Sequence, residues 1–303
     1  MQIFNFFPNH ITSILKNYTS NIETSLEEIR FRAGQPIILK FYNNDIVTNY
    51  KSTSNDLLEI LEKLCENSIY SYQNQICNGY ITIVGGHRVG ITGNVIINDN
   101  KIVNINNISS LNFRIAKQVL GCANEILKYI INFENNTIFN TLIISSPGAG
   151  KTTILRDTIR QLSNGIGNFN GKTIGVVDER NEISATYNGI AQNDLGIRTD
   201  ILENIPKYMG MTMLLRSMSP QIICADEIGS FKDVESIKYI ICSGVKCIFT
   251  AHGRTMKELE LNFSLQKLLK IHMFERIIFL DEKNRGKLKD IYKLNDNKYE
   301  IFK

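Results

Sequence analysis

Apolar and polar positions follow two different patterns along the chain. In residues 1–135, apolar side chains repeat at helical spacing over 8–18 and over 54–66, where a Ser-Asn-Asp sequence offers a capping signal. Residues 26–39 predict a strand that ends in an Ala-Gly-Gln-Pro turn. Four β-type runs separated by Gly-Gly and Asn-Asp-Asn turns follow, at 80–84, 88–97, 101–105 and 109–115. With a helix expected at 117–131, this part predicts a small α+β domain with an antiparallel sheet.

Residues 136–303 instead alternate between short apolar runs and amphipathic stretches. Strands are expected at 141–145, 173–178, 221–226 and 246–250. Helices are expected at 151–162, 208–217, 231–242 and 256–271. A terminal hairpin is expected at 275–280 and 288–294. Such alternation predicts the α/β class with a parallel sheet. We therefore expect two domains, 1–135 and 136–303.

A phosphate-binding loop is predicted at Ser145-Ser-Pro-Gly-Ala-Gly-Lys-Thr152, between an expected strand and an expected helix. Its glycines let successive backbone N–H groups face an anion at the positive end of the new helix. Lys151 would reach the β- and γ-phosphates of ATP, and Thr152 would bind Mg²⁺. Ser145 stands where the usual pattern has Gly. The predicted nucleotide-binding residues are Pro147, Gly148, Ala149, Gly150, Lys151, Thr152 and Thr153.

A pair of acids ends the apolar run Gln221-Ile-Ile-Cys-Ala-Asp-Glu227. A buried parallel strand delivers side chains at its carboxyl end, so these acids are expected on the same sheet edge as the phosphate loop. Asp226 would hold Mg²⁺ through its water shell, and Glu227 would orient and polarise the attacking water. The alternative is a helix cap or a solvated strand end.

Two further strands are expected to end in polar groups at this edge. One ends in Asp178-Glu179-Arg180, and the other in Thr250-Ala-His252. Asp178 and Glu179 are candidate catalytic acids near the Mg²⁺ shell, and His252 is a candidate neutral donor near the γ-phosphate. A lone histidine is more often a packed or surface residue. The combination of four strand ends favours a role in catalysis.

Composition supports a folded, soluble, reduced protein. Hydrophobic residues make up 43% and charged residues 21%, and 34 Lys plus Arg against 30 Asp plus Glu give a formal net charge of +4. This mild excess does not favour nucleic acid as a partner. The six cysteines form no C-x-x-C pair, which favours buried thiols in a cytosolic protein. The sequence contains no apolar stretch long enough for a membrane span, so no direct membrane insertion is expected.

These motifs together resemble the secretion ATPase superfamily, whose members carry a phosphate loop, an aspartate box, an acidic box and a histidine box in this order. Here they correspond to Ser145–Thr152, Val176–Glu182, Ser219–Gly229 and Phe249–His252. The chain is similar in particular to the stage III sporulation ATPase branch, AA component, of endospore-forming bacteria. The segments that carry this similarity are 26–36, 79–93, 108–115, 177–183, 192–200, 216–220 and 226–229.

The resemblance implies a RecA-like P-loop ATPase domain, ATP and Mg²⁺ as cofactors, and assembly into a homohexameric ring. It implies a cytoplasmic protein of the mother cell that docks on membrane components of the sporulation channel and energises that apparatus. An arginine finger is expected from a neighbouring subunit, with Arg88 or Arg114 as guesses. Two alternatives remain. One is a nucleic-acid-remodelling ATPase, and the other is a nucleotide-switched scaffold without sustained turnover.

Overall fold

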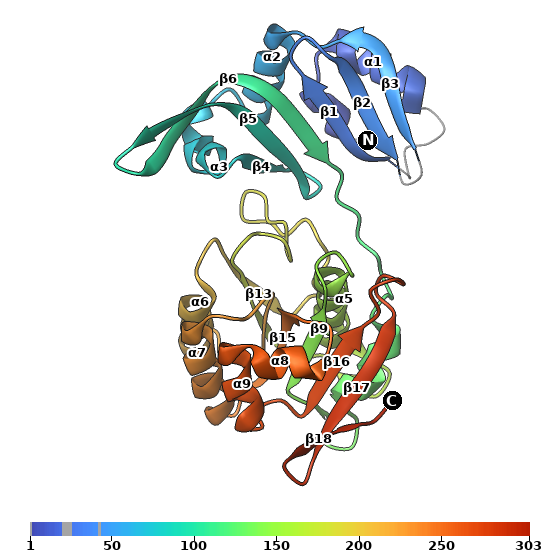
Figure 1. The fold of residues 1–303 in the computed structure, drawn as a ribbon, viewed down its shortest axis with the longest axis vertical. Helices are drawn as coiled ribbons and strands as arrows, with labels where there is room; N and C mark the ends of the chain where they lie inside the picture. The colour runs from blue at the N-terminus through green and yellow to red at the C-terminus, as the bar shows by residue number, and fades with distance from the viewer. Residues whose placement is uncertain (1, 20–25, 42–43) are drawn as a thin grey trace. The chain divides into compact units, whose positions relative to one another are not determined.

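The computed structural model describes residues 2–19, 26–41 and 44–303, which form two compact units (Figure 1). Unit 1 comprises Met1–Lys117 and Ala185–Gln192, and unit 2 comprises Gln118–Ser184 and Asn193–Lys303. The sequence places the boundary at 135/136, whereas the structure divides after Lys117. The reason is that residues 123–138 contribute Ala123, Ile126, Ile130, Ile131 and Ile138 to a core cluster of unit 2.

Unit 1 is built on an antiparallel sheet with the strand order β3-β2-β1-β6-β5-β4. Its helices are the 3₁₀ helix Gln2–Phe6, α1 (Asn9–Thr19), α2 (Ser54–Leu64), the 3₁₀ helix Ile69–Tyr72 and α3 (Gln73–Cys77). Its strands are β1 (Leu26–Arg32), β2 (Pro36–Phe41), β3 (Asp45–Lys51), β4 (Tyr80–Ile83), β5 (His87–Asn98) and β6 (Lys101–Arg114). The expected small α+β unit with an antiparallel sheet is confirmed.

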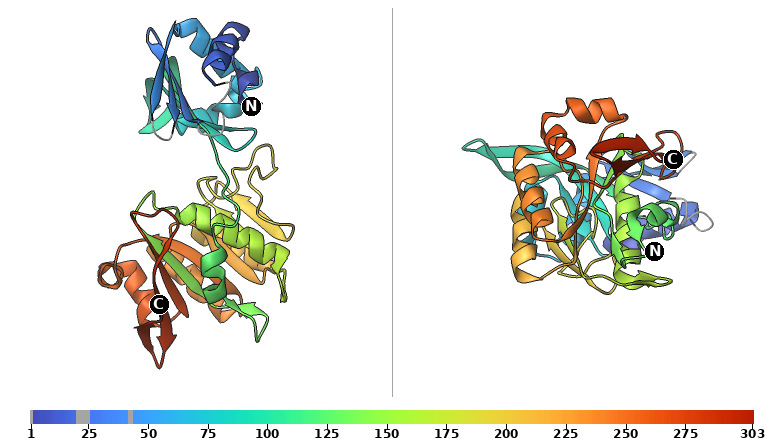
Figure 2. Two further views of the ribbon diagram at one scale, coloured as in Figure 1. Left: turned by 90° about the vertical axis from the view of Figure 1, so that its right-hand side faces the viewer. Right: turned by 90° about the horizontal axis from the view of Figure 1, so that it is seen from below.

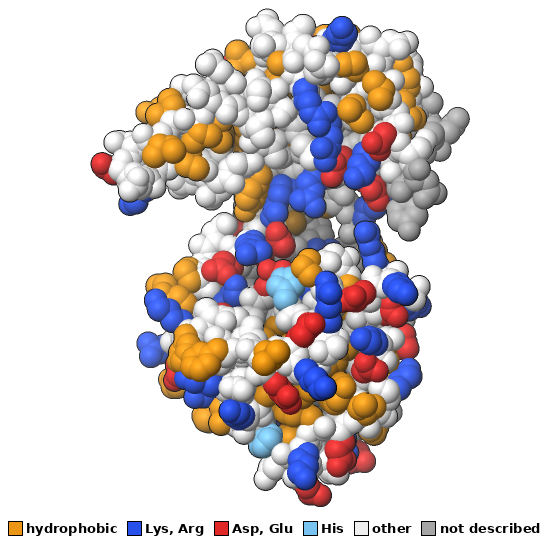
Figure 3. Space-filling model, in the orientation of Figure 1, with side chains coloured by type: hydrophobic (Ala, Val, Ile, Leu, Met, Phe, Trp, Pro, Cys, Tyr) orange, Lys and Arg blue, Asp and Glu red, His pale blue; other side chains and the backbone are white. Residues whose placement is uncertain are grey.

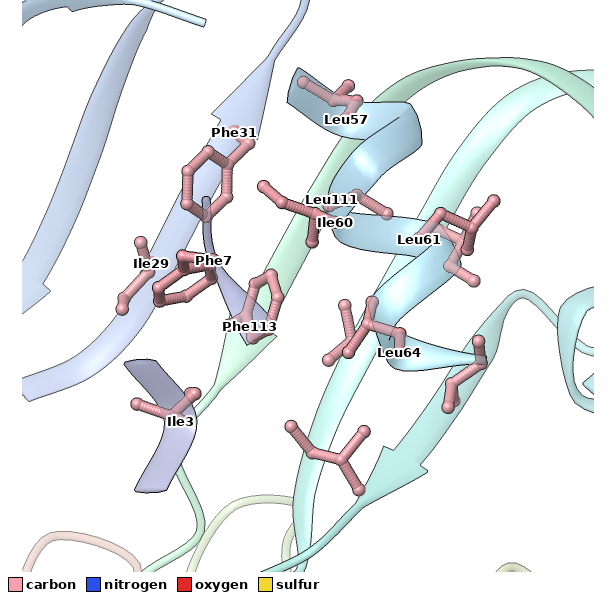
Figure 4. Packing of buried hydrophobic residues seen from close by; sticks show 14 of the residues in the cluster. Ile3, Phe7, Ile29, Phe31, Leu57, Ile60, Leu61, Leu64, Leu111 and Phe113 are labelled. Carbon is pink, nitrogen blue, oxygen red and sulfur yellow. The ribbon is translucent and has the colours of Figure 1, made fainter. Parts of the chain in front are cut away.

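An aromatic cluster forms the centre of the unit 1 core (Figure 4). The rings of Phe7 and Phe113 lie 4.9 Å apart between centroids, and those of Phe31 and Phe113 lie 5.7 Å apart. Tilted and edge-on contacts at such distances are favoured by the ring quadrupoles. The apolar face of α2 packs on this cluster through Leu57 and Ile60. A capping box between Thr53 and Asp56 starts this helix one residue before the expected Ser-Asn-Asp signal.

A separate segment, residues 185–192, belongs to unit 1 although it lies between elements of unit 2 in the sequence. The Tyr187 hydroxyl donates a hydrogen bond to the Glu66 carboxylate. The Gly85 amide donates to the Gln192 side chain at 2.8 Å. A Cβ built on Gly86 would lie 3.0 Å from that of Ala185, so a small residue is required there. The chain therefore passes between the units three times.

Unit 2 is a mixed sheet with the strand order β13-β12-β14-β15-β9-β16-β17-β18. Its strands are β9 (Thr141–Ser145), β12 (Ile174–Asp178), β13 (Thr199–Glu203), β14 (Ile222–Ala225), β15 (Lys246–His252), β16 (Arg276–Leu280), β17 (Leu288–Asn295) and β18 (Lys298–Ile301). Its helices are α4 (Asn124–Ile130), α5 (Lys151–Asn164), α6 (Lys207–Ser217), α7 (Phe231–Cys242), α8 (Met256–Leu261) and α9 (Phe263–Lys270). Two short ribbons pair β7 (Ile131–Asn132) with β8 (Thr137–Ile138) and β10 (Gly165–Ile166) with β11 (Phe169–Asn170).

The first six strands of this order pair in parallel, and β17 and β18 extend the sheet antiparallel. Figure 2 shows α5 on one face of the sheet and α6 with α7 on the other. Neighbouring strand residues alternate between these faces: Ile143 belongs to the α5-side core, and Leu142 and Ile144 belong to the opposite one. The carboxyl ends of β9, β12, β14 and β15 consequently lie along one edge.

The structure departs from the expected elements at several places. The expected helix 117–131 forms only from Asn124, after Gly121 with a φ of +78°. The expected helix 256–271 is divided at Asn262, whose side chain accepts hydrogen bonds from the amides of Ser264 and Leu265 and caps α9. The runs 101–105 and 109–115 form the single strand β6, and strands β3, β13 and β18 were not expected.

Candidate nucleotide-binding site

The predicted phosphate loop connects the end of β9 at Ser145 to the start of α5 at Lys151. Gly148 and Gly150 have φ angles of +77° and +97°, which favour glycine over residues with a Cβ. Ser145 is buried, and its hydroxyl donates to the Ser146 carbonyl at 3.1 Å. The strand thus accommodates a side chain at the position where the common pattern has glycine. Pro147, Ala149 and Thr153 lie in the same strand–loop–helix segment, as expected.

Lys151 is buried at the centre of the site, with only 5% of its surface exposed. Its ammonium group donates to the carbonyls of Ser145 and Ser146 and to Nδ1 of His252, each at 3.2 Å. Burial lowers the pKa of Lys151, and the negative charges of Asp226 and Glu227 oppose this shift. A buried cation with neutral hydrogen-bond acceptors is a favourable place for an anionic ligand.

Asp226 follows β14 and contacts the phosphate-loop helix directly. Its carboxylate accepts hydrogen bonds from the hydroxyls of Thr152 and Thr250. Burial raises the pKa of Asp226, whereas these two hydroxyl groups lower it. Mg²⁺ sites in phosphate-binding proteins use one or two protein oxygens and complete their shell with phosphate and water. The hydroxyl of Thr152 and the carboxylate of Asp226 form a donor set of this kind.

Glu227 lies beside Asp226 with a φ of +52°, a backbone conformation that is uncommon for a non-glycine residue. Its amide donates to the Thr250 hydroxyl at 2.8 Å. One carboxylate oxygen lies 2.9 Å from Nε2 of His252, and the other lies 2.9 Å from Nη1 of Arg180. Because the Lys151 ammonium can only donate, Nδ1 of His252 accepts and Nε2 carries the proton that faces Glu227.

Asp178 and Glu179 lie at the same edge but make other contacts. Asp178 is buried, and its two oxygens accept from the amides of Glu182, Ile183 and Ser184 at 2.7–3.1 Å and from the Ser184 hydroxyl at 2.6 Å. Glu179 forms an ion pair with Lys207. The structure therefore places Asp178 as the anchor of the turn that follows β12 and pairs Glu179 with a helix residue. Their expected role near Mg²⁺ stays a prediction.

Several contacts of this site were not anticipated from the sequence. Thr250 joins Asp226 to the backbone of Glu227, and Arg180 pairs with the Glu227 carboxylate. The β16–β17 loop also lies against the phosphate loop, since Gly286 donates its amide to the Ala149 carbonyl at 2.9 Å. In the same loop, Glu282 accepts from the Ser146 hydroxyl. The available signals were a threonine two residues before His252 and an arginine directly after the 178–179 acids.

On the face of unit 2 that Figure 3 displays, acidic and basic side chains are interspersed. In the described part of the chain, no three His, Cys, Asp or Glu side chains are grouped so as to hold a metal ion. A search of the described helices finds none with the length and apolar character of a membrane span.

Comparison with known proteins places the chain in a family. The model of the family "Sporulation stage III, protein AA" matches residues 1–299. The chain belongs to this family. It is 36% identical over 297 residues to the Stage III sporulation protein AA of Bacillus subtilis (strain 168), covering 98% of this chain and 96% of the relative. An uncharacterized protein, ycf45, of Cyanidium caldarium is 28% identical over 229 residues, covering 74% of this chain and 59% of the relative.

The fold is similar to that of two solved structures, an ATPase and a pilus retraction motor. The Legionella pneumophila ATPase DotB superposes with a TM-score of 0.61 at 14% identity, covering 96% of this chain and 82% of DotB. The pilus retraction motor PilT gives 0.54 at 13% identity, covering 88% of this chain and 77% of PilT. The expected α/β fold and the resemblance to the sporulation branch of these ATPases are thereby confirmed.

Proposed function

We propose that this protein binds ATP with Mg²⁺ at the loop Ser145–Thr152 and hydrolyses it as one subunit of a homohexameric ring that energises the mother-cell-to-forespore channel. The observation that carries the proposal is the surroundings of Lys151. This buried cation donates to two carbonyls and an imidazole nitrogen, with the Thr152–Asp226 contact and Glu227 beside it. The negative charge of a triphosphate would pair with Lys151, and Mg²⁺ at Thr152 and Asp226 would neutralise the remaining charge.

Each side chain has a distinct task in this proposal. Lys151 would turn from the loop carbonyls to the β- and γ-phosphates, since phosphate oxygens are anionic acceptors and carbonyls are not. Thr152 and Asp226 would hold Mg²⁺, which supplies neutralisation of the charge on the transferred phosphoryl group. Glu227 would accept a proton from the attacking water and orient it. His252, protonated on Nε2, would turn this N–H from Glu227 towards the γ-phosphate once Lys151 has left Nδ1 and freed the ring to rotate.

The test separates ATP binding from hydrolysis. Glu227→Gln keeps the shape of the side chain but removes the basic carboxylate, so turnover should fall by about 100-fold or more while ATP affinity stays within about 3-fold. Binding would be measured by isothermal calorimetry and turnover by phosphate release. Glu235→Gln, on the exposed face of α7, serves as the matched control and should leave both unchanged. Full turnover in Glu227→Gln would overturn the assignment of the base.

The proposals of a ring and of a channel partner rest on the family and on the similar proteins. One relative is named a stage III sporulation protein, and one fold neighbour is a pilus retraction motor solved with ADP. If finger arginines arrive from a neighbouring subunit, turnover per subunit should rise with protein concentration at saturating ATP. A flat specific activity across the monomer-to-oligomer transition, followed by light scattering, would count against the ring.

The proposed site of action is the cytoplasmic face of the mother-cell membrane, where membrane components of the sporulation channel would recruit the ring. This follows from the family name and from nothing in the site itself. Adding the cytoplasmic part of a candidate channel protein should raise turnover of the assembled protein. A single-stranded DNA that raised turnover instead would favour the nucleic-acid-remodelling alternative.

A further inference from the structure

Arg180, just after the end of β12, contacts the proposed water-orienting acid Glu227 just after the end of β14. Its Nη1 lies 2.9 Å from Oε2 of Glu227, and Nε2 of His252 lies 2.9 Å from Oε1 of the same carboxylate. The two oxygens of Glu227 are thus held from two different strand ends. Charge-assisted hydrogen bonds of this length are directional as well as strong.

The main chain of Glu227 is fixed independently of this pair. Its amide donates to the Thr250 hydroxyl at 2.8 Å and to the Asp226 carboxylate at 3.1 Å. A φ of +52° persists in a glutamate only where the surroundings enforce it. With the backbone fixed, the direction of the carboxylate is set by the groups that bind its two oxygens. Those groups are Arg180 and His252.

Arg180 is itself held by an anchored turn. The Asp178 carboxylate binds the amides of Glu182, Ile183 and Ser184, which closes the chain just beyond Arg180. From the helix α5, Arg156 donates to the carbonyls of Glu182 and Ile183, both at 2.9 Å. The helix that begins with Lys151 and Thr152 therefore also fixes the turn that carries Arg180.

We propose that Arg180 is a positioning residue for the reaction, which holds the Glu227 carboxylate towards the attacking water within the same subunit. This inference rests on the proposed ATP hydrolysis. His252 holds Glu227 through Nε2, and this contact would be lost when the Nε2–H turns towards the γ-phosphate in the proposed reaction. Arg180 would then be the group that keeps Glu227 in place throughout the cycle.

This role predicts a loss of turnover without a loss of folding or binding. The side chain of Arg180 is 66% exposed, and exposed ion pairs contribute little to stability. Arg180→Ala should therefore leave the unfolding midpoint and the ATP affinity nearly unchanged. Misplacement of a water-orienting group should lower kcat by about 10- to 100-fold. Arg180→Lys restores the cation without the planar fork and should recover part of this loss.

The decisive experiment is a double-mutant cycle with Glu227→Gln, measured as single-turnover hydrolysis and as ATP affinity on the full chain. If Arg180 acts through Glu227, Arg180→Ala lowers the rate of the wild type but has no further effect on Glu227→Gln. Lys238→Ala, which removes a cation from an exposed α7 ion pair, should change neither background.

Three outcomes would overturn the inference. Equal losses from Arg180→Ala in both backgrounds would mean that Arg180 acts on the nucleotide itself or on a neighbouring subunit. Unchanged turnover in Arg180→Ala would mean that the ion pair has no part in the reaction. A wild-type chain that binds ATP but never hydrolyses it would refute the proposed function, and the positioning role with it.

Discussion

Asp56 in unit 1 and Lys151 in unit 2 are charged side chains that the fold buries to the same extent, with 5% exposure each, but their partners differ. Asp56 accepts hydrogen bonds from the Thr53 amide at 2.7 Å, from the Tyr50 hydroxyl at 2.8 Å and from His10. The hydrogen bonds that Lys151 donates go to neutral groups and are longer, at 3.2 Å. The acid in unit 1 therefore has partners that favour its charge, whereas the hydrogen bonds of Lys151 in unit 2 go to neutral acceptors.

The two pKa shifts express this contrast. Burial raises the pKa of Asp56, but the hydrogen bonds from Thr53, Tyr50 and His10 outweigh it, so the net pKa is lowered. Burial also disfavours the charged form of Lys151, and here the attraction of the nearby acids does not restore the usual pKa. A buried charge is therefore informative about function when its partners fail to compensate its burial.

The largest effect is expected from removing the uncompensated charge. Lys151→Met should lower ATP hydrolysis by at least about 100-fold, because no other cation takes its place at the phosphates. The unfolding midpoint without nucleotide should not fall, since an apolar side chain of similar length replaces a desolvated cation. Scanning calorimetry would measure the unfolding midpoint, and phosphate release would measure the rate of ATP hydrolysis. Retained turnover, or a clearly less stable variant, would break the contrast with Asp56.

Asp178 offers a second test, because it is a compensated charge inside unit 2. Asp178→Ala leaves several amides of the turn without an acceptor and should cost about 2–4 kcal/mol in the free energy of unfolding. Urea unfolding of the nucleotide-free protein, followed by circular dichroism, would report it. Asp178→Asn, with one carbonyl oxygen left, should be intermediate. Lost turnover at unchanged stability would instead favour the expected catalytic role of Asp178.

A matched pair of aspartates compares the units directly. Asp56 and Asp233 both close a capping box at the third position of their helices, α2 and α7. Replacing either by alanine should destabilise its helix by about 1–2 kcal/mol, and more for Asp56 because of its further bonds. Hydrogen exchange of the α2 and α7 amides would show this locally. The ATP affinity of Asp56→Ala should stay within about 2-fold, since its loss is confined to packing in unit 1.

The smallest expected effect is a pH dependence of unit 1. The folded-state pKa of Asp56 is lowered, so its contribution to stability is present above the unfolded pKa near ~3.9 and is lost as pH falls through the folded value. Asp56→Asn should therefore lose less stability than the wild type between pH 5 and pH 3. Identical acid sensitivity of α2 hydrogen exchange in the two proteins would contradict this account.

The sequence predicted best the features that depend on short contiguous segments. The phosphate loop is contiguous, and the acids at 226 and 227 follow an apolar strand, so their shared sheet edge follows from parallel pairing alone. The direction in which a side chain points does not follow from strand pairing. Asp178 stands at the expected strand end, but the amides of 182–184 turn its carboxylate inward, and no residue pattern signals that bond.

Contacts between distant segments explain the rest of what was missed. The approach of Arg180 to Glu227 depends on the adjacency of β12 and β14, which only the sheet order fixes. The contact of Gly286 with Ala149 requires the loop of the β16–β17 hairpin, far along the chain, to return to the phosphate loop. Likewise, Thr53 rather than the following Ser caps α2 because Asp56 reaches back to its amide.

The excursion of residues 185–192 into unit 1 has a practical consequence for dissecting this protein. A fragment ending at Lys117 would lack the partners of Glu66 and of the Gly85 amide, and a fragment starting at Gln118 would carry an eight-residue insertion without its host. Neither fragment retains all the contacts that its residues make in the whole chain. We therefore expect both units to be expressed together. An exchange of unit 1 between relatives should include the segment 185–192 as well as residues 1–117.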